Sequence, residues 1–117
     1  MVVRLEPEIE RIIAPWRGKK HLLRFVEDGE KYTSFYSRLA KGMNALSARI
    51  GEDATYYAAR HSWATLARND CGVDKYTVHE ALGHSDTATK MDDIYIKKDY
   101  SIYWAANRKV MDLFSWD

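Results

Sequence analysis

Three polar residues in the second half of the chain carry side chains that could act together on a phosphodiester. They are the guanidinium of Arg60, the imidazole of His84 and the phenol of Tyr95. A guanidinium can donate two parallel hydrogen bonds to phosphate oxygens, and a phenol can attack phosphorus as a nucleophile. These residue types therefore predict a phosphate site, provided that the fold brings the three side chains together.

Each residue suits one role in the cleavage of a phosphodiester without a metal ion. Such a reaction needs a nucleophile, donors that stabilise the charge of the transition state, and an acid for the departing 5′ oxygen. We expect Tyr95 to be the nucleophile and Arg60 to hold the non-bridging oxygens. His84 could donate to the same phosphate or take the phenolic proton. A phenol has a pKa of ~10 and is therefore a better leaving group than an alkoxide. For that reason a phosphotyrosine link could be reversed without ATP.

Each of the three also has a purely structural interpretation. Arg60 suits the surface of an amphipathic helix, and His84 suits a helix C-terminus, where the helix dipole favours a positive imidazole. Tyr95 lies between two isoleucines, as a tyrosine at the edge of a core often does. Two neighbours of Arg60 are interpreted as structural, Trp63 as a core anchor and His61 as a hydrogen-bonding partner.

The apolar periodicity predicts a mainly α chain with little or no sheet. Residues 17–32 are expected to be irregular, with a short buried or strand-like piece around Leu22 to Val26. Helices are expected from Pro7 to about Pro15, from Ser34 to Ile50, from Thr55 to Cys71, from Asp74 to Leu82, from Asp86 or Thr87 towards Tyr95, and from Asp99 to about residue 114. In the last helix we expect inward side chains at Ile102, Tyr103, Ala106, Val110 and Leu113.

Composition places the chain among ordinary globular proteins. It has 117 residues, 46% of them hydrophobic and 30% charged, with no repeat or linker, so we expect one domain over residues 1–117. We find no membrane span and no signal peptide, and therefore expect a cytoplasmic protein. Cys71 is the single cysteine, which excludes an internal disulfide. The net charge of +1 argues weakly against a nucleic-acid partner.

The polar trio stands in a longer pattern that resembles a known family. Residues 34–114 resemble the C-terminal part of the catalytic domain of tyrosine recombinases, the phage-type integrases, particularly the branch of Bacteroides-type mobile elements. The matching segments are Tyr56-Tyr57-Ala58-Ala59-Arg60-His61-Ser62-Trp63-Ala64-Thr65, Leu82-Gly83-His84-Ser85, Tyr95-Ile96 and Asn107-Arg108-Lys109-Val110.

The resemblance implies DNA strand breakage and rejoining, as in site-specific recombination or integration. It makes Arg60 the second catalytic arginine, His84 the histidine of the third motif, and Tyr95 the residue that forms a 3′-phosphotyrosyl intermediate. It implies double-stranded DNA and other recombinase protomers as partners, the C-terminal helix around residues 99–114 being able to dock on a neighbour. It calls for no cofactor and no metal.

The chain departs from the family pattern in two places. The family has a histidine three residues before the arginine, where this chain has Tyr57, a plausible hydrogen-bond donor to phosphate but a poor base. The interval from His84 to Tyr95, 95 − 84 = 11, is longer than the common one. Tyr100 and Tyr103 are therefore the alternative nucleophiles.

The family's first catalytic arginine and its hairpin lysine have no counterpart that we can assign. We therefore expect a truncated catalytic domain that binds DNA weakly and does not complete strand exchange by itself.

Two other interpretations stay open. Asp74 to Leu82, a glycine turn and a following helix outline a helix-turn-helix, which would make the chain a non-enzymatic DNA-binding module. Residues 87–93 of that second helix, however, offer one lysine and two acids. A metal site is a weaker alternative because its candidate ligands match no common zinc spacing; they are Cys71, His61, His79 and His84.

Overall fold

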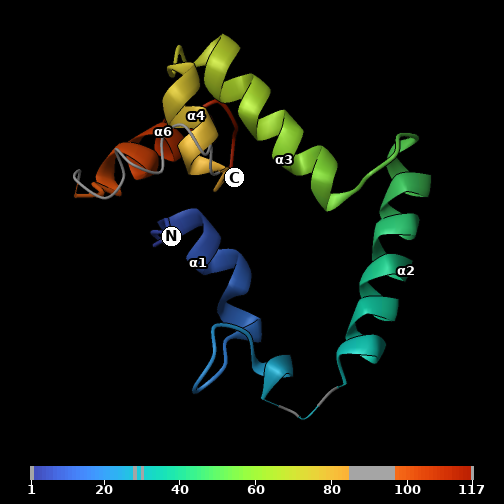
Figure 1. Ribbon diagram of the computed structural model, residues 1–117. Coiled ribbons are helices and arrows are strands. Elements are labelled where there is room, and N and C mark those ends of the chain that lie inside the picture. Colours follow the sequence, from blue (N-terminus) through green and yellow to red (C-terminus); the bar gives the residue numbers. More distant parts are fainter. Residues whose placement is uncertain (1, 28, 30, 85–96, 117) are drawn as a thin grey trace. The chain divides into compact units, whose positions relative to one another are not determined.

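The chain is mainly helical, as the periodicity predicts. The computed structural model describes residues 2–27, 29, 31–84 and 97–116 (Figure 1). The α-helices of these residues are α1 (Pro7–Ile13), α2 (Tyr32–Ile50), α3 (Tyr56–Thr65), α4 (Lys75–Ala81) and α6 (Ser101–Met111). Within the described ranges, β pairing consists of one isolated bridge between Arg17 and Leu23. The expected helix between Asp86 and Tyr95 lies outside the described residues.

The chain divides into two compact units. The C-terminal unit comprises Met1–Arg4 and Ala59–Asp117, and the N-terminal unit comprises Leu5–Ala58. Each is described by itself below. The assignment of residues 1–117 to one domain stays a prediction.

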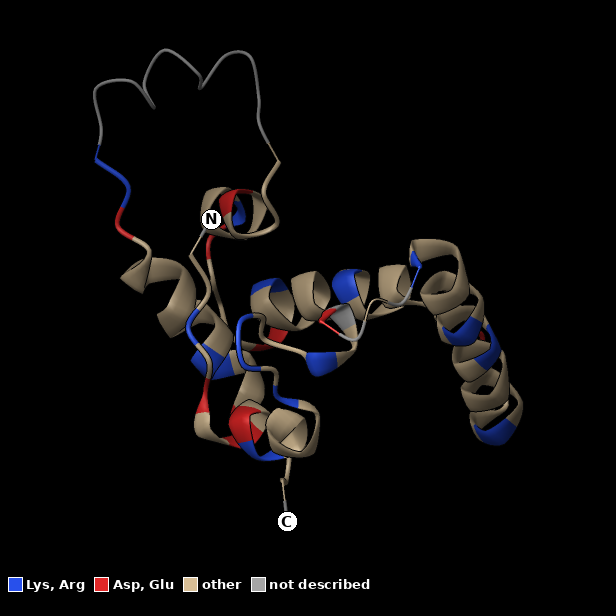
Figure 2. Cartoon of the chain, turned by 90° about the horizontal axis from the view of Figure 1, so that it is seen from below, with Lys and Arg blue, Asp and Glu red and all other residues tan. Residues whose placement is uncertain are grey.

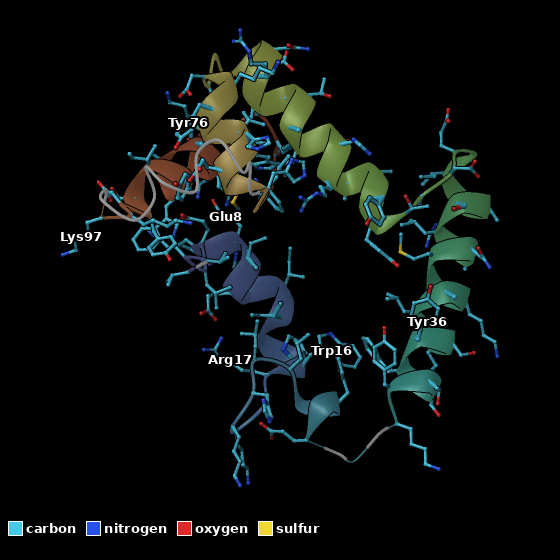
Figure 3. All side chains as sticks on the ribbon, in the orientation of Figure 1. Glu8, Trp16, Arg17, Tyr36, Tyr76 and Lys97 are labelled. Atoms are coloured by element: carbon cyan, nitrogen blue, oxygen red, sulfur yellow. The ribbon has the colours of Figure 1, made fainter. Side chains whose placement is uncertain are left out.

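The N-terminal unit begins with a proline-started helix, as predicted. Glu6 is the N-cap of α1 and Pro7 occupies its first turn, where the missing N–H removes no helical hydrogen bond. The helix passes into the 3-10 turn η1 (Ala14–Trp16), which contains the second proline. Arg17, labelled in Figure 3, donates to the carboxylate of Glu10 at 2.8 Å and so fastens this turn back onto α1.

The segment predicted to be irregular is held by one carboxylate. Glu27 accepts the backbone N–H of Lys19 at 3.0 Å, that of Lys20, and that of His21 at 2.5 Å. These hydrogen bonds, led by the one from His21, lower the pKa of Glu27. A Cβ on Gly18 would come within 2.6 Å of the same carboxylate and 2.5 Å of the His21 carbonyl oxygen, so the loop requires glycine there. The 3-10 turn η2 (Arg24–Val26) precedes Glu27.

Helix α2 confirms the helix predicted up to Ile50, although it begins two residues earlier, at Tyr32. It ends where Gly51 adopts a left-handed conformation with φ of 74°. Phe35 stacks on Phe25 with ring centroids 5.1 Å apart. Of the other apolar residues spaced along the helix, Leu39, Leu46 and Ile50 are exposed, Leu46 at 44%, whereas Met43 is half-buried.

The C-terminal unit contains the core. Its buried members come from the π-helical segment η3 (Leu66–Asp70), which continues α3, from the loop after η3, and from α4 and α6. They are Ala67, Val73, Val78, Ala106 and Val110. Trp63 and Leu82 pack against them while partly buried. The predicted cap of α4 is confirmed, because Asp74 accepts the N–H of Thr77 at 2.8 Å.

The predicted inward face of α6 is correct in its middle and wrong at its ends. Ala106 and Val110 are each 4% exposed, whereas Ile102 is 53% and Leu113 48% exposed. Ile102 stands in the first turn, and Leu113 follows the last helical residue, Met111, so the helical spacing no longer applies to it. Met111, one residue after Val110, is buried instead.

Candidate functional site

Arg60 is held by the turn that follows α4. Thr55 caps α3, as predicted, by accepting the N–H of Ala58 at 2.9 Å, and this places Arg60 in the first half of the helix. Its half-buried side chain donates through Nη2 to the carbonyl oxygen of Leu82. Arg60 therefore reaches the segment Leu82-Gly83-His84, although 22 residues separate it from Leu82.

The turn that carries His84 is shaped by glycine. Helix α4 ends at Ala81, and Gly83 follows with φ of 73°, a left-handed conformation that strains any residue with a Cβ. The N–H of Gly83 donates to the carbonyl oxygen of Glu80 at 2.9 Å, and that of His84 donates to the carbonyl oxygen of His79 at 3.2 Å. His84 is exposed at the helix terminus, where the glycine break predicted it.

Two imidazoles meet at this turn. The rings of His79 and His84 lie edge to face, with centroids 4.9 Å apart and planes inclined by 79°. His79 was identified from the sequence only as a possible metal ligand. No sequence signal for the ring contact was available, because residues five apart on a regular helix do not face each other. The ring contact is made where α4 ends and Gly83 adopts the left-handed conformation.

The remaining predicted site residues are Tyr95, Tyr57 and the two alternative nucleophiles, Tyr100 and Tyr103. Tyr95 lies outside the described residues. Tyr57 stands three residues before Arg60 on α3 and is 63% exposed. The alternative nucleophiles are close to each other: Tyr100 and Tyr103 have ring centroids 6.2 Å apart, and the hydroxyl of Tyr103 donates to Glu80 at 2.9 Å.

Tyr57 belongs to a group of exposed tyrosines in the N-terminal unit, which sequence reasoning missed. The ring of Tyr57 lies 5.8 Å from that of Tyr56, and Tyr32 and Tyr36 on α2 pair at 6.1 Å. A hydrogen bond with Tyr36, labelled in Figure 3, raises the pKa of Tyr56, because the neutral phenol is favoured beside another phenol. The described surroundings of Tyr57 thus offer a phenolic surface.

The helix that carries Arg60 is joined to α6 by a half-buried hydrogen bond between two side chains. Trp63, one turn after Arg60, donates through Nε1 to Oδ1 of Asn107 at 3.0 Å. A cavity of about 180 Å³ lies beside this pair, lined mainly by apolar side chains that include Leu82 and Trp104. The N-terminal segment reaches the same region, because Nε1 of Trp104 donates to the Val2 carbonyl oxygen at 2.9 Å. Arg60 and His84 do not line this cavity.

The described cations of the C-terminal unit include Arg108, Lys97 and Lys98. Arg108 on α6 binds Asp112, the C-cap residue of that helix, at 2.7 Å. Lys97 and Lys98 are exposed, and Figure 2 shows both charges just before α6. The side chain of Lys97 extends away from the ribbon (Figure 3). These two lysines follow the segment that contains Tyr95.

Within the described part of the chain, no three histidine, cysteine, aspartate or glutamate side chains are grouped so that they could hold a metal ion. No helix of that part is both long and apolar enough to span a bilayer. The second helix of the helix-turn-helix alternative lies in the range 85–96 and hence outside it.

No match was found in the comparisons of the chain with protein-family models, with curated proteins and with solved structures.

Proposed function

We propose that the chain breaks and rejoins DNA as a tyrosine recombinase, through a 3′-phosphotyrosyl intermediate on Tyr95. The observation that supports this proposal is the hydrogen bond from Arg60 to the Leu82 carbonyl oxygen. It joins the arginine motif to the Leu82-Gly83-His84 motif, so Arg60 contacts the turn that carries His84. The proposed compartment is the cytoplasm, and the proposed partners are double-stranded DNA and further recombinase protomers.

The chemistry balances without a cofactor. The phenolic oxygen of Tyr95 forms a bond to phosphorus and loses its proton, while the bond from phosphorus to the 5′ oxygen breaks and that oxygen gains a proton. Rejoining runs these events in reverse, with the 5′ hydroxyl as nucleophile. Because the new ester is similar in energy to the old one, no external energy source is consumed.

Arg60 retains the donors that this reaction needs. A guanidinium carries five N–H donors, and the contact with Leu82 involves Nη2. The remaining donors can bind the non-bridging oxygens of a phosphate in the fork geometry. His84 is exposed two residues beyond Leu82 and can donate to the same phosphate. Tyr57 is proposed as an additional phosphate donor in place of the family's histidine.

The family also uses an arginine and a lysine for which this chain offers no assigned counterpart. The proposal therefore concerns an incomplete catalytic domain, slow by itself, because loss of one transition-state donor typically reduces a rate by about 100-fold or more. A substrate with an activated leaving group is needed for a sensitive assay.

The experiment uses nicked DNA duplexes of randomised sequence in which sulfur replaces the bridging 5′ oxygen. A thiolate leaves without protonation, so the assay requires the nucleophile and the phosphate donors but no general acid. We expect a covalent protein–DNA adduct on a denaturing gel. Tyr95→Phe should abolish the adduct and leave DNA binding unchanged, whereas the matched variants Tyr100→Phe and Tyr103→Phe should retain it. An undiminished adduct in Tyr95→Phe would refute Tyr95 as the nucleophile.

A further inference from the structure

The imidazole of His79 contacts the ring of His84, and α4 does not need this contact in order to form. Its ring is half-buried, and Nε2 is enclosed without a hydrogen-bond partner among the described residues. Neighbouring polar side chains are satisfied: Asp74 binds Thr77, and Glu80 binds Tyr103. A buried polar atom without a partner is unfavourable, and an apolar side chain would fill the same place without that penalty. The imidazole of His79 therefore calls for an explanation other than packing.

The position of His79 next to His84 supplies an explanation for the imidazole. Its carbonyl oxygen accepts the N–H of His84, and its ring meets the ring of His84 at 4.9 Å. The backbone bond fixes where the Cα of His84 lies, and the ring contact acts on the side-chain torsions. An exposed histidine on a turn would otherwise sample several rotamers, which lowers the fraction of time spent in the orientation that donates to phosphate.

The turn is thus held from two sides. Arg60 binds the carbonyl oxygen of Leu82, and His79 binds both the backbone and the ring of His84. Gly83 lies between these contacts in the left-handed conformation that makes both possible. Removal of the His79 ring would leave the backbone bond intact and release only the imidazole of His84.

We propose that His79 is a positioning residue, whose ring holds the imidazole of His84 in the orientation that binds the phosphate. This inference rests on the proposed recombinase function, but the orientation itself can be measured without DNA. It extends the site to a residue that does not touch the substrate.

The first experiment is NMR spectroscopy of the isotope-labelled chain. It compares His79→Leu, which removes the aromatic ring, with His79→Phe, which keeps a ring but no nitrogen, and uses His21→Leu as a control at an exposed position. We expect contacts between the ring protons of His79 and His84 in the wild type. His79→Leu should shift the ring resonances of His84 and average its side-chain couplings, and His79→Phe should preserve one rotamer. The control should change neither.

Two outcomes overturn the inference. One is that neither substitution changes the ring resonances or the side-chain couplings of His84. The other is that His79→Leu and His79→Phe disorder the His84 side chain equally, because the ring contact then does not determine its orientation. If His79→Leu does not fold, absence of ring-proton contacts in the wild type is itself decisive against the inference.

The second experiment measures single-turnover adduct formation on the thiolate substrate. We expect His79→Leu to lower the rate about tenfold at saturating DNA with an unchanged Kd, and His79→Phe to restore most of the rate. An unchanged rate in His79→Leu overturns the positioning role. Complete absence of an adduct with the wild type counts against the recombinase proposal instead, which separates the two failures.

Discussion

At the scale of single residues, the proposed phosphate site depends on the forked head group of Arg60. One of its nitrogens contacts the Leu82 carbonyl oxygen while the others stay available for an anion. A lysine in the same place has one compact ammonium group and cannot bind the turn and a phosphate in the same geometry. If the proposed function is correct, a positive charge alone is therefore insufficient at this position.

We expect Arg60→Lys to reduce the single-turnover rate of adduct formation by about 100-fold, because a transition-state donor is lost. DNA affinity should change much less, since the positive charge is kept. Arg68→Lys, at an exposed position on η3, is the matched control and should have a rate close to that of the wild type. Equal rates in the two variants would show that the fork of Arg60 has no role.

Gly83 determines the turn that follows α4 and carries His84. Gly83→Ala should lower the free energy of unfolding by ~1–2 kcal/mol, the cost of a left-handed conformation with a Cβ. Gly42→Ala, in the middle of α2 with nothing within 4 Å of the added carbon, should instead raise it by ~0.5–1 kcal/mol. Chemical denaturation followed by circular dichroism distinguishes them, and effects of the same sign would contradict the assigned backbone conformation.

At the scale of elements, α4 is started by an ionised cap. Asp74 accepts both the hydroxyl of Thr77, at 2.5 Å, and its backbone N–H. These bonds, led by the hydroxyl, lower the pKa of Asp74. A carboxyl whose pKa is lower in the folded state stabilises that state above its unfolded pKa of ~3.9, and this contribution is lost as the pH falls through the folded pKa.

We therefore expect Asp74→Asn to remove part of the loss of stability between pH ~5 and ~2 while changing the stability at pH 7 little, because asparagine is an equally good cap. Asp74→Ala should cost ~1 kcal/mol at pH 7 through loss of the cap. Denaturant titrations over this pH range measure both. A pH dependence in Asp74→Asn identical to that of the wild type would contradict the role of the ionised carboxylate.

The helices differ in how much of their apolar face is buried. Val110 on α6 is 4% exposed, whereas Leu46 on α2 is 44% exposed. Val110→Ala should therefore lower the free energy of unfolding by ~2 kcal/mol, and Leu46→Ala, although it removes more atoms, by less than ~1 kcal/mol. A larger effect of Leu46→Ala would mean that α2 is covered in solution.

At the scale of the whole molecule, the near-zero net charge limits how tightly the proposed DNA partner could be held. Its 18 lysines and arginines are nearly balanced by 17 acidic residues. A protein of this kind neutralises few phosphates, so we expect the logarithm of the DNA association constant to fall with the logarithm of salt concentration with a slope of about −3. Fluorescence anisotropy at several salt concentrations measures the slope. A value near −10 would require a strongly basic surface that this charge balance does not predict.

The sequence by itself determined the local features of this protein. Pro7 at a helix start, the caps Thr55 and Asp74, and the stops at Gly51 and Gly83 follow from backbone conformation and hydrogen bonding within a few residues, which is why they could be predicted. Arg60 and His84 were predicted as site residues from the chemistry of their side chains and from the short motifs that contain them.

Only the tertiary structure decided which side chains meet. The contact between Arg60 and Leu82 and the ring pair of His79 and His84 depend on the angle at which the chain leaves α4, and no periodicity encodes that angle. The tertiary structure also decided which apolar side chains are buried. Ile102 has the helical spacing of a buried residue but is exposed. Contacts between distant segments depend on packing of the whole unit, and that is a property of the fold rather than of any short stretch of residues.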